Sequence, residues 1–149
     1  MRIENWDTKL ADYVAKHAEG KFIRGKTDCV TFVVNAIELI TGKKVFDTEY
    51  KTLKEAKEIL KKLKKKNLFD IANDIAKENK FKKIDTAFAK RGDVVFLETD
   101  EELGGTMCIC IGEQSIFRIR SGSLEKRQTN KCHHAWSIEW VVRQLKQLW

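Results

Sequence analysis

Residues 25–33 read Gly25-Lys26-Thr27-Asp28-Cys29-Val30-Thr31-Phe32-Val33, a polar start followed at once by an apolar run. Thr27 and Asp28 have side chains that cap the free N–H groups of a helix. The apolar period after them continues as far as Thr41-Gly42, where glycine suits a helix end. The pattern therefore predicts a buried central helix that carries Cys29 in its first turn.

Cys29 is the first candidate for chemistry in this chain. The unpaired N–H groups and the positive dipole end at a helix start stabilise a thiolate, which is the nucleophilic form of cysteine. Cysteine is also one of the most commonly buried residue types. The segment alone leaves two readings open, a reactive thiol and a structural one.

Outward from this helix, the rest of the first half is predicted to be helical. Apolar residues from Trp6 onward recur at three- and four-residue intervals, with a candidate cap at Asp7 and an end near Gly20. His17 is expected on the apolar side of that helix. A capping box formed by Thr52 and Glu55 begins a third helix. Helical periods then cover residues 53–63 and 68–75.

The second half is predicted to form an antiparallel sheet. Runs of β-type residues cover 94–97, 107–111, 115–119 and 136–140. Residues 112–114 suit a hairpin, and Asp93 is expected to hold a turn by accepting backbone N–H bonds. Residues 141–148 could close the chain as a helix. Helices followed by antiparallel strands indicate an α+β fold, with amino-terminal helices packed on a carboxy-terminal antiparallel sheet.

Length and composition indicate one globular domain over residues 1–149. The chain has 42% hydrophobic and 34% charged residues, with no linker and no apolar stretch long enough to cross a bilayer. Neither a signal peptide nor a membrane association is expected, so the cytoplasm is the default location. The four cysteines are expected as free thiols.

The net charge of +7 is compatible with a polyanionic partner. Much of the excess lies in a run that reads as the solvated face of a helix. That run comprises Lys61, Lys62, Lys64, Lys65 and Lys66. Nucleic acid is disfavoured as a partner because no pattern of interleaved aromatic and basic residues accompanies the run.

Several short motifs resemble one enzyme family. The pattern Gly25-x-x-Asp28-Cys29-x-x-Phe32-Val33, then Thr41-Gly42, then Arg91-Gly92-Asp93-Val94-Val95-Phe96 is similar to the NlpC-type branch of the papain-like cysteine peptidases. The segment Cys132-His133-His134-Ala135-Trp136 resembles small NlpC-like proteins found with phage tail genes. The resemblance covers residues 6 to 140 as separate motifs.

The resemblance implies a papain-like fold with Cys29 as the nucleophile and Thr27 and Asp28 beside the substrate. In active members a histidine begins the second strand, but Thr106 stands there in Thr106-Met107-Cys108-Ile109-Cys110-Ile111-Gly112. A hydroxyl cannot accept the thiol proton at neutral pH. His133 or His134 could act as the base instead, provided that one of them reaches Cys29.

A zinc site is a further candidate role for the cysteines of this chain. Cys108, Cys110, Cys132 and His133 are ligand types that zinc accepts. Cys108 and Cys110 would lie about 6.5–7 Å apart on one face of a strand, farther than two thiolates on one tetrahedral zinc. They are expected as small apolar residues on the core face of a central strand, and no metal or cofactor is expected.

Three functions remain open. The first is a phage or prophage-derived, tail-associated structural or accessory protein with a degenerate peptidase site, whose partners are tail components and whose location includes the virion. The second is an active cysteine hydrolase that cuts a peptide, amide or ester bond, with peptidoglycan stem peptides as a candidate substrate. The third is a basic intracellular module that holds a protein or polyanion in the cleft between helix and sheet.

Overall fold

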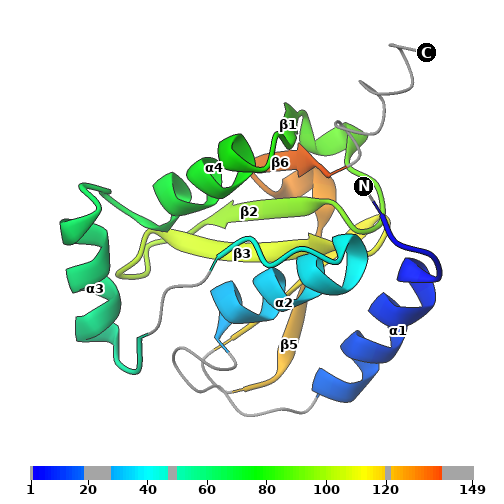
Figure 1. Cartoon of the computed structure of the whole chain (residues 1–149), viewed down its shortest axis with the longest axis horizontal. Helices are drawn as coiled ribbons and strands as arrows, with labels where there is room; N and C mark the ends of the chain where they lie inside the picture. Colours follow the sequence, from blue (N-terminus) through cyan, green and yellow to red (C-terminus); the bar gives the residue numbers. More distant parts are fainter. Residues whose placement is uncertain (1, 19–27, 47–49, 120–121, 139–149) are drawn as a thin grey trace.

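The computed structural model describes residues 2–18, 28–46, 50–119 and 122–138. Within them, four α-helices precede all the strands of a six-stranded sheet (Figure 1). The helices are α1 (Trp6–His17), α2 (Cys29–Thr41), α3 (Leu53–Lys62) and α4 (Leu68–Glu78). The strands are β1 (Lys82–Ile84), β2 (Val94–Glu98), β3 (Gly105–Cys110), β4 (Gln114–Arg118), β5 (Leu124–Gln128) and β6 (His134–Ser137), with short 3₁₀ turns η1 (Thr86–Phe88) and η2 (Thr129–Lys131). The predicted α+β class is confirmed.

Side-chain caps fix the starts of α2, α3 and α4. Asp28 accepts a hydrogen bond from the Thr31 backbone N–H at the start of α2, and Thr52 caps α3 as the capping box predicted. The prediction of a cap at Asp7 was wrong. Helix α1 begins at Trp6 after Asn5, and Asp7 lies inside the first turn. A carboxylate there interacts favourably with the positive end of the helix dipole.

The six strands form one antiparallel sheet in the order β1-β6-β2-β3-β4-β5. β6 inserts between β1 and β2, so that Val94 pairs with Ile109 on one side and with Trp136 on the other. The predicted strands after residue 92 are present, although β6 spans His134–Ser137. Residues 139 and 140 of its predicted run, and the predicted closing helix over 141–148, lie outside the described residues. β1 and β5 were not predicted, because both are rich in charged residues.

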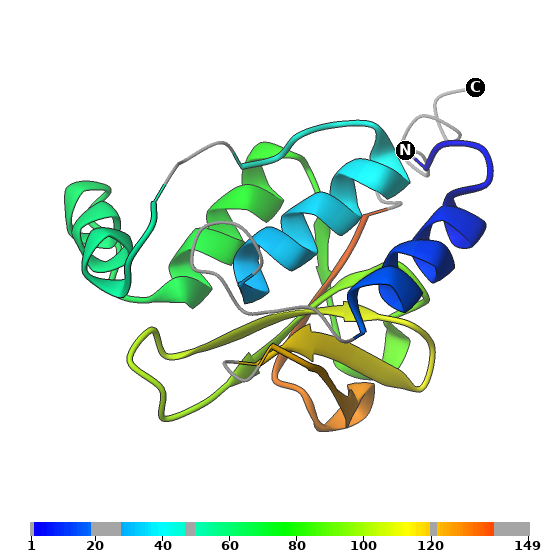
Figure 2. The same ribbon diagram turned by 90° about the horizontal axis from the view of Figure 1, so that it is seen from below.

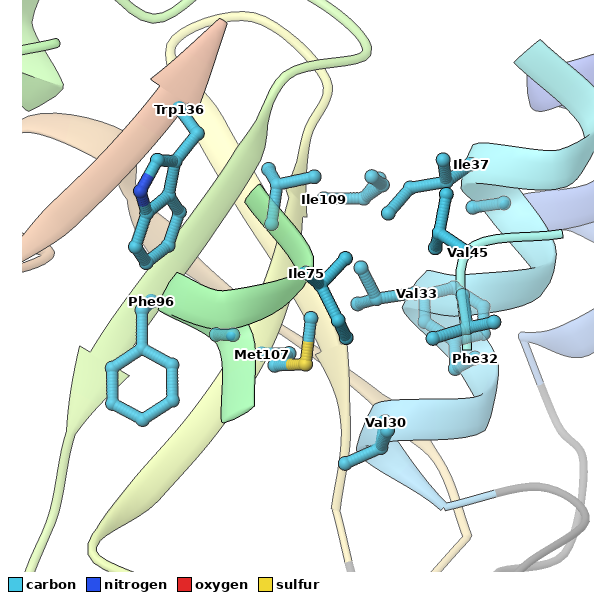
Figure 3. Packing of buried hydrophobic residues seen from close by; sticks show 14 of the residues in the cluster. Val30, Phe32, Val33, Ile37, Val45, Ile75, Phe96, Met107, Ile109 and Trp136 are labelled. Carbon is cyan, nitrogen blue, oxygen red and sulfur yellow. The ribbon is translucent and has the colours of Figure 1, made fainter. Parts of the chain in front are cut away.

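Helix α2 carries the centre of the larger core. Its buried face packs with α4 and with β3, and Figure 3 shows Val33, Ile75 and Met107 close together from these three elements. The apolar side chains of α2 recur at helical spacing, so one face of the helix can be buried continuously. Figure 2 shows α1, α2 and α4 (blue, cyan and green) gathered on the same side of the yellow strand β3.

A second, smaller core lies apart from the helix core. It consists of Val95, Cys108, Cys110, Phe117, Cys132 and Ala135. Side chains alternate along a strand, so Cys108 and Cys110 point to one face of β3 while Met107 and Ile109 join the helix core on the other. The two thiols are buried as predicted, but in this smaller core.

Candidate functional site

The strands β3 and β4 diverge beside the start of α2. They pair only at Ile109 with Ile116 and at Cys110 with Ser115 among the described residues. Farther along, Thr106 pairs with Leu97 of β2, whereas Arg118 pairs with Leu124 of β5. Figure 1 shows β5 running steeply across the direction of β2 and β3. The two halves of the sheet therefore diverge at this end.

A cleft of about 310 Å³ occupies the region where the strands diverge. Among the described residues it is lined by Cys29, Leu53, Leu97, Thr99, Asp100, Glu101, Glu102, Leu103, Gly105, Thr106, Phe117, Arg118, Ile119, Glu125 and Arg127. The lining brings together the head of α2, the β2–β3 hairpin and the outer strands. The thiol of Cys29 and the Thr106 position therefore share one cavity, as the motif resemblance implied.

The backbone around Cys29 is held by its neighbour Asp28. The Asp28 carboxylate is 1% exposed, and its Oδ1 accepts from the Thr31 N–H at 2.9 Å. Its Oδ2 accepts from the Tyr50 hydroxyl at 2.6 Å. Burial and the nearby Asp28 carboxylate raise the pKa of Tyr50, so this phenol stays protonated and donates. Asp28 thus fixes the helix start and is not among the residues that line the cleft; Thr27 lies outside the described residues.

Thr106 is buried at the cleft wall. Its hydroxyl donates to the Met107 carbonyl at 3.4 Å, and the side chain is 5% exposed. A hydroxyl in this place can hydrogen-bond to a ligand but cannot take a proton from a thiol at neutral pH. Thr106 therefore supplies shape and polarity to the cleft.

The two late histidines make their contacts away from this cleft. His133 Nδ1 accepts from the Glu98 backbone N–H at 2.9 Å. His134 Nε2 lies 2.8 Å from a Glu98 carboxylate oxygen, its Nδ1 lies 3.0 Å from Lys83 Nζ, and its ring packs on Phe69. The contact with His134 lowers the pKa of Glu98. Neither imidazole is among the described residues that line the cleft.

Arg118 is the residue of the cleft that the sequence analysis missed. It is 2% exposed, its Nη1 donates to the Gly122 carbonyl at 2.5 Å, and its Cζ lies 5.5 Å from the centre of the Phe32 ring. Burial lowers the pKa of Arg118, although an arginine stays charged at any ordinary pH. Its position two residues after Ile116, on the same face of a strand, was the available signal.

The third histidine, His17, is the last residue of α1 and lies beside two aromatic rings. Its ring centre is 4.5 Å from that of Tyr13 and 6.2 Å from that of Phe32. Burial first, then the positive charges of Arg118 and Lys16, lower the pKa of His17. The expected place of His17 on the apolar side of its helix is therefore observed.

Comparison with known proteins places the chain in a family. Residues 1–138 match the family described as Domain of unknown function (DUF6950). The chain belongs to this family. No curated protein matches it. Among solved structures it is similar to the NlpC/p60 domain of the peptidoglycan hydrolase SagA, with a TM-score of 0.54 and 18% identity over 88% of this chain and 97% of that one.

The structural likeness establishes the fold and no more, because the identity is low. This member of the DUF6950 family has an NlpC-type fold, as the motifs around Cys29 and Asp93 predicted. The helices in the described part of the chain are too short or too polar to cross a membrane. The described residues also hold no group of three or more His, Cys, Asp or Glu side chains arranged for a metal ion.

Proposed function

We propose that this chain is a phage- or prophage-derived accessory protein of tail assembly, in which the NlpC-type cleft binds a peptide or a protein segment without cutting it. The observation that carries the proposal is the presence of Thr106 in the cleft of Cys29, where a hydrolase of this type needs an imidazole. The association with tails rests on the resemblance of residues 132–136 to tail-linked NlpC-like proteins.

The contacts of the histidines support a cleft without hydrolytic chemistry. A general base must lie within hydrogen-bond reach of the proton that it removes. His133 and His134 instead bond to the backbone and side chain of Glu98. Moving either ring into the cleft would break these bonds.

An active cysteine hydrolase is the second candidate function. Cys29 is partly exposed in the first turn of α2, and it opens into a cleft with polar walls. Backbone N–H groups near Cys29 are the donors that would stabilise an oxyanion. In this reading Cys29 attacks a peptide or amide carbonyl, with stem peptides of peptidoglycan as the candidate substrate and His133 or His134 moved within reach as the base.

The experiment that separates the two functions is a digestion of peptidoglycan fragments followed by mass spectrometry. We expect the same product pattern for the native chain and for Cys29→Ser, because no bond is cut. New peptides that depend on Cys29 would overturn the non-hydrolytic proposal and establish the hydrolase.

The tail association is tested by the protein content of particles. Phage particles and tail intermediates from the host that encodes this chain are purified and searched for it by mass spectrometry. We expect the chain in one of these fractions, and Cys29→Ser to be incorporated to the same extent. Its absence from both fractions would contradict a role in tail assembly.

A further inference from the structure

The guanidinium of Arg118 has one edge without a partner. Among the described residues, its Nε and Nη2 atoms are buried and make no hydrogen bond, while Nη1 is bonded to the Gly122 carbonyl. A buried polar group without a partner costs free energy, more so when it is charged. Native structures seldom leave such donors unpaired, so this edge requires an explanation.

The two unpaired atoms are neighbours on the guanidinium plane. The N–H bonds of Nε and Nη2 that face this edge point the same way and are spaced to meet the two oxygens of a carboxylate. The remaining nitrogen, Nη1, holds the side chain in place through Gly122. This bond limits the fork to small rotations before any ligand arrives, which reduces the entropy lost on binding.

Arg118 lines the same cleft as Cys29 and the start of α2. The start of this 13-residue helix brings the positive end of its dipole to the cleft wall. Because Nε and Nη2 are buried, the guanidinium must turn slightly towards the cavity to meet a ligand. The flexible side chain of an arginine allows this movement.

Acidic side chains around the cleft select among anions. Glu125 is paired with Arg127 at 2.5 Å and Glu102 with Lys57, whereas Asp100 and Glu101 stand exposed at the rim of the β2–β3 hairpin. A dianion such as phosphate, or a polyanion, is repelled by this rim. A molecule with one carboxylate and a separate positive charge matches both walls.

We propose that Arg118 anchors the carboxylate of a short peptide in the cleft, with the peptide's amino group towards Asp100 and Glu101. This inference rests on the proposed function, since it names the ligand class of the same cleft. Cleavage depends on Cys29 and position 106, whereas carboxylate capture depends on Arg118. The two proposals can therefore fail separately.

The test uses trialanine with free ends, trialanine amide, N-acetyl-trialanine and inorganic phosphate as probes, titrated into the ¹⁵N-labelled full chain by NMR. We expect trialanine to bind about tenfold or more tightly than its amide, because the charged fork loses its partner in the amide. Acetylation of the amino end should weaken binding less, since the acidic rim is exposed to solvent.

Variants at position 118 test whether Arg118 causes the preference for the free carboxylate over the amide. In Arg118→Gln the preference for acid over amide should fall to about one, and Arg118→Lys should retain only part of it because lysine cannot form the fork. Arg127→Gln is the matched control at the exposed wall, and it should leave the preference within about twofold. Thermal unfolding of each variant verifies its fold; should Arg118→Gln not fold, the Arg118→Lys comparison decides.

Four outcomes would overturn the proposal. The first two are equal binding of trialanine and its amide to the native chain and an unchanged preference in a folded Arg118 variant. The others are phosphate binding tighter than trialanine and a larger loss of affinity from acetylation than from amidation.

Discussion

Cys29 of α2 and Thr106 of β3 line one cleft, although 77 positions separate them in the chain. They meet because β3 leaves β4 after two paired positions and so uncovers the head of the helix. In the proposed function, Thr106 stands at the place of the base and cannot act as one. The proposal therefore makes the side chain at position 106 the feature that limits chemistry at Cys29.

Thr106→His should activate the Cys29 thiol. An imidazole at this wall would stabilise the thiolate, so the rate of iodoacetamide alkylation of Cys29 at pH 7 should rise by about fivefold or more. Intact mass and peptide mapping measure the rate, and Cys29→Ser gives the background rate without this thiol. The glutamine of Thr106→Gln is similar in size to histidine but has no basic ring, so this variant should react like the native chain. Equal rates for the His and Gln variants would contradict the shared-cleft geometry.

His133→Ala and His134→Ala should leave the reactivity of Cys29 unchanged within about twofold between pH 5 and 9, because no base assists the thiol from outside its cleft. The measurement is the pH profile of alkylation for each variant beside the native chain. A profile whose midpoint moves upward in either variant would favour the hydrolase function and identify the base.

The sequence predicted those parts of the site that depend on local pattern. Aspartate is a common N-cap residue, and Asp28 caps α2 as predicted. Asp93 stands just before a strand, where it was expected to hold a turn, and it accepts a hydrogen bond from the Lys90 backbone N–H at 2.8 Å. The ion pair between Asp93 and Arg2 could not be predicted, since it joins residues 91 positions apart.

The parts that were missed depend on tertiary contacts. β5 reads Leu124-Glu125-Lys126-Arg127-Gln128, and only its pairing with β4 makes it a strand. Arg118 resembles an ordinary polar residue at a strand end. Its place two residues after Ile116 puts it on the inner face of a strand, but its burial follows from the divergence of β3 from β4 and from the packing of α2 above it, which the local sequence does not show.

Tyr50→Phe should destabilise the fold by about 1–3 kcal/mol, because the buried Asp28 carboxylate loses a donor at 2.6 Å. Urea unfolding at pH 7 measures the loss. The matched control is Tyr13→Phe, which removes a hydroxyl that donates to a neutral acceptor, the Phe32 carbonyl, at 2.7 Å, and which should cost about 0.5–1.5 kcal/mol. A smaller loss for Tyr50→Phe than for Tyr13→Phe would show that Asp28 does not depend on this bond.

His17 should make the fold less stable in acid. Its pKa in the folded chain lies below the ordinary value of 6.5, because burial and the charges of Arg118 and Lys16 disfavour the imidazolium. Near pH 6 the unfolded chain then binds more protons at this site than the folded chain does, so the free energy of unfolding rises with pH. The contribution of His17 to stability is complete above its unfolded pKa and falls as the pH drops below it.

The check is the difference between the unfolding free energies at pH 8 and pH 5, measured in urea for the native chain and for His17→Gln. The variant should show the smaller difference, because glutamine does not titrate. An NMR titration adds a second readout, in which Arg118→Gln should raise the pKa of His17 by removing the positive charge that faces it. A His17 pKa at or above 6.5 in the native chain, or one indifferent to Arg118, would contradict the packing of this histidine against the guanidinium.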